Sequence, residues 1–265
     1  MRFFVTGSAG FIGFHLSKVL LDEGHRVHGY DGLTDYYDVR LKNLRHGLLA
    51  QQSGFSHTVG MLEDAPKLYD AYVKSEADVV IHLAAQAGVR YSIESPDSYI
   101  SSNIVGTHNV LEMCRSRPPQ HLLMASTSSV YGANELQPFR EVDKADTPLS
   151  LYAATKKANE AMGHSYAHLF GIPITMFRFF TVYGAYGRPD LALYKFVSSA
   201  LKDEAIDVYN HGKMARDFTH VGDLAKAISL LCNHPPSSPN ARSETTIPND
   251  TLSPAAAFRI VNIGN

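Results

Sequence analysis

The sequence predicts an α/β fold in which helices cover both faces of a doubly wound parallel sheet. Apolar strand-like runs alternate with helical patterns from the first residue to Phe180. The strand-like runs are almost continuously apolar, which is typical of parallel strands that are buried on both faces. With 265 residues, of which 45% are hydrophobic, the chain can bury a substantial core in one or two domains.

Strands and helices are expected to follow one another in strict alternation through most of this region. The expected strands are Arg2–Thr6, Arg26–Tyr30, Phe55–Val59, Asp78–Leu83, His121–Ser126 and Ile174–Phe179. The expected helices are Phe11–Glu23, Ala65–Ser75, Asp97–Ser116 and Tyr152–Phe170. Breaks at Pro118-Pro119 and Gly171-Ile172-Pro173 fall where a helix should give way to a strand.

The alternation weakens after Phe180. A helix is predicted near Leu193–Lys202 and a strand near Ile206–Tyr209. Residues 234–254 are rich in Pro, Ser, Thr and Asn, which is typical of a mobile loop. Residues 258–265 look like another strand, and because a domain seldom ends on a fresh strand, we expect this region to be incomplete.

Composition argues against several classes of function. The net charge is −2 and the 13 histidines are scattered, so we expect neither a basic face for nucleic acid nor a metal site. Two cysteines, Cys114 and Cys232, are too few for a disulfide framework and indicate a reducing compartment. No apolar run approaches the roughly 20 residues of a membrane span. The first strand leaves no room for a signal peptide, so we expect a cytoplasmic protein.

A glycine-rich turn, Thr6-Gly-Ser-Ala-Gly-Phe-Ile-Gly13, joins the first expected strand to the first helix. Glycine is needed where the chain turns tightly, where backbone approaches a pyrophosphate and where the helix packs on the strand. The helix N-terminus then offers N–H groups and a positive dipole end to phosphates. The spacing of Gly7, Gly10 and Gly13 is one residue wider than the usual dinucleotide fingerprint, and a purely structural turn is the alternative.

Asp31 ends the second expected strand, 18 residues beyond Gly13. A carboxylate at this position accepts hydrogen bonds from a ribose diol and repels a 2′-phosphate. The position therefore favours NAD over NADP as the cofactor, although Asp31 could also serve as a helix or turn cap.

Tyr152 and Lys156 are four residues apart on an expected helix and so lie on the same side of it. A phenol with a pKa near 10 is a poor base at neutral pH. A nearby ammonium group and a nicotinamide cation would stabilise the phenolate and lower that pKa. Because this spacing is common by chance on surface helices, it indicates a catalytic pair only together with other features.

Four consecutive hydroxyl residues, Ser126 to Ser129, close the fifth expected strand. Open α/β sheets bind ligands at the carboxyl ends of their strands. The hydroxyl of Thr127 could therefore bond the reacting sugar oxygen or the tyrosine oxygen. A Ser/Thr-rich cap of the next segment is the alternative, and it would account for one of these hydroxyls but not for four.

Together these motifs resemble the extended short-chain dehydrogenase/reductase family of nucleotide-sugar enzymes, and the resemblance covers almost the whole chain. Further segments that carry it are His82-Leu-Ala-Ala85, Asp35-Tyr-Tyr-Asp-Val-Arg-Leu-Lys42, Gln86-Ala-Gly-Val-Arg-Tyr91, Arg178-Phe-Phe-Thr-Val-Tyr-Gly184, Gly187-Arg-Pro-Asp190, Val208-Tyr-Asn-His-Gly-Lys213 and Arg216-Asp217. The resemblance implies a Rossmann-like NAD-binding domain over residues 1–180 and a smaller UDP-sugar region over 181–265, with 217–233 packing back on the first domain. It also implies a homodimer.

The resemblance implies roles for individual residues. Tyr152 would be the catalytic base, Lys156 would bind ribose and tune that base, and Thr127 would be the hydroxyl partner. Besides these and Asp31, the implied cofactor contacts are Gly7, Gly10, Phe11, Ile12, Gly13, Leu83, Ala84, Ala85 and Asn103. The implied substrate contacts are Arg90, Ser128, Ser129, Thr181, Arg188, Lys195, Val208 and Arg216.

Arg216 would meet the UDP pyrophosphate, and Arg188 and Thr181 would face a sugar carboxylate, for which a guanidinium is suited because it can bond bidentately. A solvated loop charge is the alternative for Arg188. The chain departs from the family pattern at Ala185-Tyr186, where Pro-Trp is usual, at Gly32, where Asn is usual, and at Met61, where an aspartate is expected.

The implied reaction is reversible inversion at C4 of UDP-glucuronate to UDP-galacturonate through a 4-keto intermediate. Decarboxylases and 4,6-dehydratases of the family carry an acidic residue within the hydroxyl stretch, which is Ser126-Thr-Ser-Ser129 here. A UDP-galactose 4-epimerase would need no carboxylate ligand, so the segment around Arg188 argues against it. A non-catalytic NAD-binding protein of the same fold is the alternative from another class.

Overall fold

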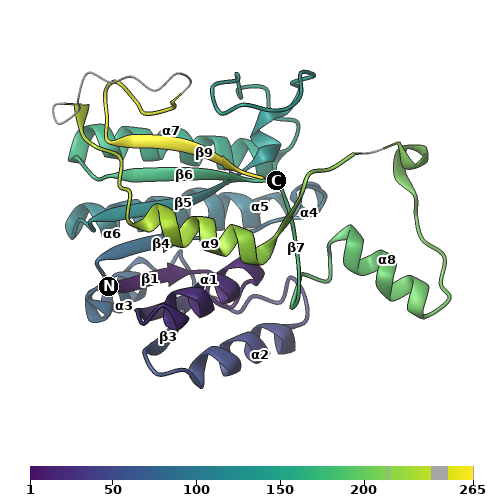
Figure 1. Ribbon diagram of the computed structural model, residues 1–265, viewed down its shortest axis with the longest axis horizontal. Coiled ribbons are helices and arrows are strands. Elements are labelled where there is room, and N and C mark those ends of the chain that lie inside the picture. Colours follow the sequence, from purple (N-terminus) through teal and green to yellow (C-terminus); the bar gives the residue numbers. More distant parts are fainter. Residues whose placement is uncertain (214, 240–249, 265) are drawn as a thin grey trace.

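The computed structural model describes residues 1–213, 215–239 and 250–264. Its centre is a seven-stranded sheet with the strand order β3-β2-β1-β4-β5-β6-β9, and all neighbouring strands in it are parallel (Figure 1). The strands are β1 (Arg2–Thr6), β2 (Arg26–Asp31), β3 (Phe55–Val59), β4 (Val79–His82), β5 (His121–Thr127), β6 (Ile174–Phe179) and β9 (Phe258–Ile263). The predicted doubly wound parallel sheet is therefore confirmed.

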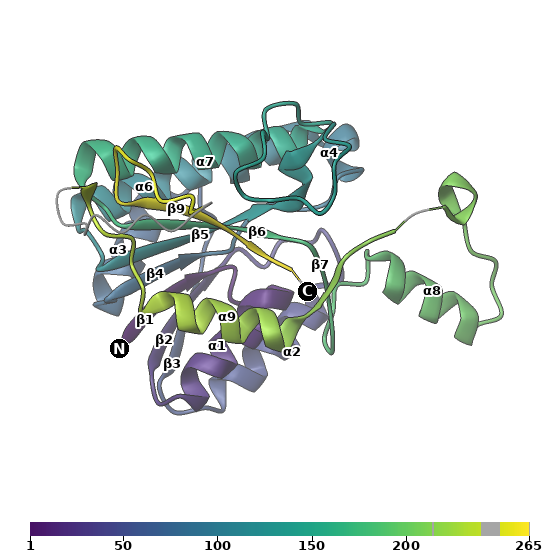
Figure 2. The same ribbon diagram turned by 45° about the horizontal axis from the view of Figure 1, so that its top comes forward.

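Helices cover both faces of the sheet (Figure 2). One face carries α1 (Phe11–Asp22), α2 (Val39–Ala50) and α9 (Val221–Cys232). The other carries α3 (Ala65–Ser75), α6 (Gly106–Ser116) and α7 (Leu151–Phe170). The short helices α4 (Tyr91–Glu94) and α5 (Pro96–Tyr99) and a π-helical turn, η1 (Ile100–Val105), precede α6, and a 3₁₀ turn, η2 (Ser128–Tyr131), follows β5.

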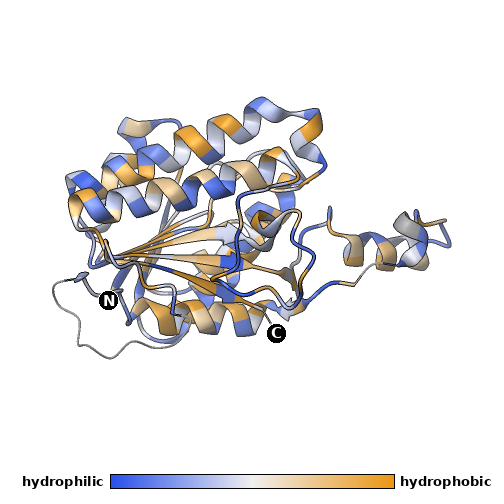
Figure 3. Ribbon diagram, turned by 90° about the horizontal axis from the view of Figure 1, so that it is seen from above, coloured by the Kyte–Doolittle hydropathy of each residue, from blue (hydrophilic) through white to orange (hydrophobic). Residues whose placement is uncertain are grey.

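The core is divided by the sheet because successive side chains of a strand point to opposite faces. On β1, Phe3 and Val5 pack in the cluster with α1, α2 and α9, whereas Phe4 packs in the cluster with α3, α6 and α7. The apolar strands lie between the two helical layers in Figure 3. This double burial explains the near-continuous apolar runs in the sequence.

After β6 the chain leaves the sheet. A second, two-stranded parallel sheet pairs β7 (Thr181–Tyr183) with β8 (Phe218–His220). Between them, α8 (Ala192–Leu201) projects away from the body in Figures 1 and 2, and a 3₁₀ turn, η3 (Tyr209–Gly212), follows it. The chain then returns, so that α9 packs against α1 and β9 extends the large sheet beside β6.

One sequence-based expectation is wrong, and one helix was missed. The expected strand at Ile206–Tyr209 does not form: residues 204–208 have no regular structure, and the side chains of Ile206 and Val208 are exposed without a partner strand. The helix α2 was not predicted at all. Of the predicted loop over 234–254, residues 240–249 lie outside the described residues. None of the described helices is both long and apolar enough to cross a membrane.

Candidate active site

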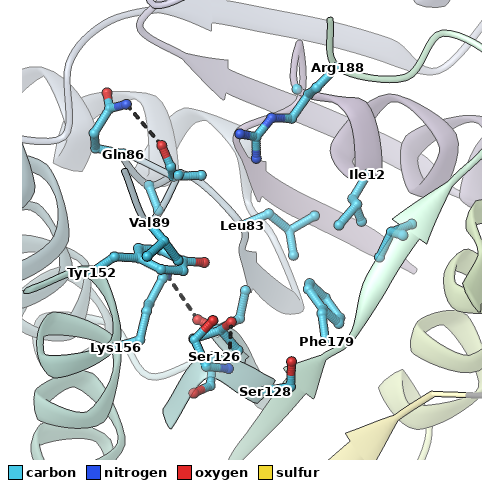
Figure 4. A pocket seen from close by; sticks show the side chains of 18 of the residues that line it. Ile12, Leu83, Gln86, Val89, Ser126, Ser128, Tyr152, Lys156, Phe179 and Arg188 are labelled. Atoms are coloured by element: carbon cyan, nitrogen blue, oxygen red, sulfur yellow. Dashed lines mark hydrogen bonds between the residues drawn. The ribbon is translucent and has the colours of Figure 1, made fainter. Parts of the chain in front are cut away.

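A cleft of about 1590 Å³ lies along the carboxyl ends of the sheet strands and extends to the segments after β6. It is larger than the roughly 300–1,000 Å³ of a pocket for one drug-sized ligand. Most of the predicted site residues line it: Gly7, Gly10, Phe11, Ile12, Gly13, Asp31, Leu83, Ala84, Ala85, Arg90, Thr127, Ser128, Ser129, Tyr152, Lys156, Thr181, Arg188, Lys195 and Arg216. In Figure 4, Tyr152 and Lys156 enter the cleft from α7 and Arg188 enters it from the opposite side.

The glycine turn leaves no room for side chains. Gly7 has φ +76°, and a Cβ added there would lie 2.7 Å from the backbone nitrogen of Ala84. A Cβ on Gly13 would overlap the carbonyl oxygen of Gly7. Helix α1 then begins after Gly10 with no side-chain cap and no acidic residue in its first turn, so its N-terminus suits an anion.

Asp31 both lines the cleft and caps the turn. Its Oδ2 accepts a hydrogen bond of 3.0 Å from the N–H of Ala9, and its Oδ1 accepts one of 2.8 Å from the N–H of Leu33. The cap interpretation therefore describes part of what Asp31 does. These bonds orient the carboxylate at the end of β2, where a ribose diol would reach it.

The departures from the family pattern at Gly32 and Met61 are physically linked. A Cβ on residue 32 would lie 2.5 Å from the Sδ of Met61, so a side chain after β2 would displace the end of the Met61 side chain after β3. Glu63 is engaged elsewhere, because its Oε1 accepts hydrogen bonds from the hydroxyls of Ser101 (2.8 Å) and Ser102 (3.0 Å).

The ionisation of Tyr152 is set by opposing effects. Burial raises the pKa of this phenol above its usual value, and a hydrogen bond with Thr127 and the positive charge of Arg188 offset this effect only in part. Thr127 also accepts a hydrogen bond of 3.2 Å from the N–H of Ser129 and so caps the 3₁₀ turn η2. The hydroxyl stretch thus supplies both a cap and a partner for the tyrosine.

Lys156 lies beneath the tyrosine, where its Nζ donates a hydrogen bond of 3.0 Å to the carbonyl oxygen of Ala125. Burial lowers the pKa of this ammonium group to about 8. The groups of the protein that lower the pKa of Tyr152 against the effect of burial are Thr127 and Arg188. Through its bond to Ala125, Lys156 fixes α7 against the end of β5, and its role in tuning Tyr152 together with the cofactor stays a prediction.

A buried network that the sequence did not reveal supports the same strand end. The hydroxyl of Ser126 donates a hydrogen bond of 2.6 Å to Oε1 of Glu160. The Nε and Nη2 of Arg178 donate to Oε1 and Oε2 of the same carboxylate, at 2.9 Å each. Burial disfavours the charged form of Glu160, but the contacts with Arg178 and Ser126 outweigh it and lower the pKa of the carboxyl group. This network holds β5, α7 and β6 together directly below Thr127.

Arg188 is held in the cleft by Asp190, which it contacts through its Nε at 2.9 Å and through its Nη2. The hydroxyl of Tyr36 donates a hydrogen bond of 3.2 Å to Oδ2 of Asp190, and the guanidinium lies 5.8 Å from the centre of the Tyr36 ring. The side chain of Arg188 is 21% exposed, so Arg188 is not a solvated loop charge.

Two predicted site residues do not line the cleft. Asn103 lies behind it, where its amide bonds the N–H and the carbonyl oxygen of Gln86 at 2.8 and 3.0 Å and so shapes the loop after β4. Val208 is 59% exposed and is not among the lining residues. Among the described residues, no group of three or more His, Cys, Asp or Glu side chains could hold a metal ion.

Comparison with known proteins agrees with this geometry. The model of the NAD dependent epimerase/dehydratase family matches residues 3–245. A probable UDP-glucuronate 4-epimerase of Rhizobium meliloti (strain 1021) is 54% identical over 264 residues, covering 100% of this chain and 77% of the relative. UDP-glucuronate 4-epimerase 3 of Arabidopsis thaliana is 45% identical, covering 98% of this chain and 60% of the relative.

Among solved structures, UDP-glucuronic acid 4-epimerase from Bacillus cereus in complex with UDP-glucuronic acid and NAD superposes with a TM-score of 0.82. It is 32% identical in sequence, and the match covers 100% of this chain and 77% of that one. Both the sequence resemblance and the fold are thereby confirmed, and the chain belongs to the NAD dependent epimerase/dehydratase family.

Proposed function

We propose that this protein is an NAD-dependent UDP-glucuronate 4-epimerase that interconverts UDP-glucuronate and UDP-galacturonate. The observation that carries the proposal is the arrangement of Tyr152 and Arg188 in one cleft. As a phenolate, Tyr152 would accept a proton, and the guanidinium opposite it is a suitable ligand for a carboxylate. Relatives named for this reaction share between 44% and 54% of their aligned residues with the chain.

The residues present suit NAD. The turn from Gly7 to Gly13 brings backbone N–H groups to the cleft with no side chain in the way, and Asp31 presents a carboxylate beside it. NAD would supply a hydride acceptor for C4 of the sugar that also returns the hydride.

Tyr152 is the group placed to hold the reacting proton. As a phenolate it would accept the proton of the C4 hydroxyl and return it when the sugar is reduced again. Thr127 and Arg188 favour this phenolate against the effect of burial. The tyrosine on α7 and the threonine on β5 are held in place relative to each other by Lys156 and by the network of Ser126, Glu160 and Arg178.

Arg188 and Thr181 would hold the C5 carboxylate of the sugar. The 4-keto intermediate is a β-keto acid, which loses carbon dioxide when the bond to its carboxylate aligns with the π system of the ketone. A bidentate contact from the guanidinium would keep the carboxylate out of that alignment. The hydroxyl stretch Ser126–Ser129 at the end of β5 contains no acidic residue, which favours epimerisation over decarboxylation or dehydration.

The test is to incubate the protein with UDP-glucuronate and to resolve the products. UDP-galacturonate is expected with no net change in NAD. UDP-pentose as the main product would assign a decarboxylase, and conversion of UDP-glucose alone would assign a UDP-galactose 4-epimerase. Absence of any transient reduction of bound NAD with every sugar nucleotide would favour a non-catalytic NAD-binding protein.

We further propose that the protein is a cytoplasmic homodimer, as the family resemblance implies. Light scattering coupled to size-exclusion chromatography measures the oligomeric state directly. Fractionation of the producing cells measures the location.

A further inference from the structure

We infer that Arg45 is a positioning residue that joins the cofactor turn to the segment carrying Arg188. Its Nη1 donates a hydrogen bond of 2.9 Å to the carbonyl oxygen of Ala9, inside the turn. Its Nη2 donates one of 2.6 Å to the carbonyl oxygen of Tyr186, two residues before Arg188. One guanidinium thus connects backbone groups that lie on the cofactor side and the sugar side of the cleft.

The environment of Arg45 is unusual for a structural arginine. The side chain is fully buried, at 0% exposure, and within the described ranges no carboxylate forms an ion pair with it. Its other partners are the hydroxyl of Tyr37, to which Nη1 donates at 2.7 Å, and the carbonyl oxygen of Gly187, which lies 3.5 Å from Nη2. An unpaired buried charge is costly. Arginine suits the position because its rigid fork of donors can bond several carbonyl oxygens at once.

The segment from Ala185 to Gly187 depends on the cofactor side for its shape. The Nε2 of His15 on α1 lies 2.8 Å from the carbonyl oxygen of Ala185, and the ring of Tyr186 packs edge-on against Phe14, at 5.3 Å between centres. Tyr186 has φ +55°, a left-handed conformation that is unfavourable for a residue with a Cβ. Outside contacts must therefore hold it, and Arg45 bonds its carbonyl group directly.

The far end of the segment is held by the same part of the chain. Tyr36, which bonds Asp190 beside Arg188, and Tyr37, which bonds Arg45, are adjacent residues in the segment between β2 and α2. The Asp35–Lys42 stretch and Arg45 therefore form a support beneath Arg188.

The connection predicts coupling between cofactor and substrate, and this step depends on the proposed recognition of a uronate by Arg188. A cofactor that orders the turn at Ala9 would also order Tyr186 through Arg45 and so prepare Arg188. Coupling of two binding sites is reciprocal. UDP-glucuronate should therefore strengthen NAD retention more than UDP-glucose does.

The experiment compares wild type with Arg45→Met, Arg45→Lys and the control Arg40→Met. Arg40 lies on the same helix, but its side chain is 91% exposed. The dissociation constants of UDP-glucuronate and UDP-glucose are measured by calorimetry for NAD-loaded and NAD-stripped protein. NAD should increase the preference for UDP-glucuronate in wild type and Arg40→Met. We expect Arg45→Met to reduce this preference by about tenfold, the effect of losing a charge-assisted contact, and Arg45→Lys to restore part of it.

Thermal melting of each variant shows whether it is folded. If Arg45→Met does not fold, Tyr37→Phe, which removes one acceptor of Arg45, should give a smaller loss of the same preference. A folded Arg45→Met protein with the wild-type preference would overturn the inference. Arg188→Ala separates the two proposals. If this variant keeps the preference for UDP-glucuronate, Arg188 is not the group that recognises the carboxylate. If the preference is lost in Arg188→Ala but kept in folded Arg45→Met, recognition by Arg188 stands and the role of Arg45 is removed.

Discussion

The Nζ of Lys156 donates a hydrogen bond of 3.0 Å to the carbonyl oxygen of Ala125, two residues before Thr127 on β5. This contact ties the helix that carries Tyr152 to the strand that carries its hydroxyl partner. The spacing of Tyr152 and Lys156 on α7 therefore also places this helix against a second element, β5. The catalytic assignments can be tested residue by residue.

Replacement of Tyr152 by Phe should abolish turnover and leave NAD bound. The change removes the proton acceptor, whereas the contacts expected for the cofactor phosphates come from the turn at Gly7 to Gly13. Product formation and the cofactor content of the purified variant are the measurements. Epimerisation within about tenfold of wild type would exclude Tyr152 as the base.

The cofactor that copurifies should be NAD or NADH. The carboxylate of Asp31 lines the cleft and should repel a 2′-phosphate. Mass spectrometry of the released cofactor tests this, and mainly NADP would contradict it. Asp31→Ser should bind NAD more weakly and discriminate less against NADP. It should also melt at a lower temperature, because the N–H groups of Ala9 and Leu33 lose their acceptor.

Arg188→Ala should separate the uronate from the neutral sugar. Loss of a charged bidentate contact should weaken the use of UDP-glucuronate by on the order of 1.5–3 kcal/mol, or roughly 10- to 150-fold, with little effect on binding of UDP. Some UDP-pentose should also form, because a loosened carboxylate can rotate into the geometry for decarboxylation. Steady-state kinetics with UDP-glucuronate and UDP-glucose are the measurement, and equal losses for both would make Arg188 a structural or nucleotide contact.

The same variant should shift the pH profile. The positive charge of Arg188 lowers the pKa of Tyr152, so its removal disfavours the phenolate and raises that pKa. The acidic limb of kcat/KM should therefore move to higher pH. An unchanged pH profile would mean that the charge of Arg188 does not affect the pKa of Tyr152.

The turn should tolerate no side chain at Gly13. Gly13→Ala places a methyl group against the carbonyl oxygen of Gly7, which distorts the turn, so the variant should lose NAD during purification. Gly163→Ala on α7 is the matched control, because its nearest neighbours would lie at 3.5 Å, an ordinary contact distance. That helical change should stabilise the protein by up to about 1 kcal/mol. Cofactor content and melting temperature distinguish the two.

Most of the central sheet could be predicted because its signal is local: apolar runs of strand length separated by helical patterns. Helix α2 could not, since its buried residues include Lys42, Arg45 and His46 as well as Leu49. A helix that turns charged side chains inward shows no apolar stripe. The opposite error occurred at Ile206 and Val208. Their apolar side chains predicted a strand, but both are exposed and pair with no strand.

The residues of the candidate site could likewise be predicted only in part. The glycine turn and the pair of Tyr152 and Lys156 follow from spacing within one element. The support of Arg188 follows only in part. Its ion-pair partner Asp190 lies two residues away in the sequence. Tyr36, which bonds Asp190, is 154 residues from Asp190 and meets it only through the fold.

Acidification should destabilise the fold before the carboxylates titrate, because buried histidines are held neutral. His82 is 1% exposed between the hydroxyls of Thr6 (2.8 Å) and Thr107 (3.1 Å), and burial, with the charge of Lys156, lowers its pKa to about 3. In the unfolded chain a histidine has a pKa of about 6.5. The unfolded state therefore binds more protons between these values, so the stability from a neutral His82 is fully present above about pH 6.5 and is lost as the pH falls toward 3. From pH 7 to 5, one such histidine should lower the free energy of unfolding by about 2 kcal/mol.

Urea denaturation at the two pH values measures this loss in wild type and in His82→Gln, which can still bond both threonines. The variant should lose about 2 kcal/mol less than wild type over this range, and an equal loss would show that His82 is not the group that titrates.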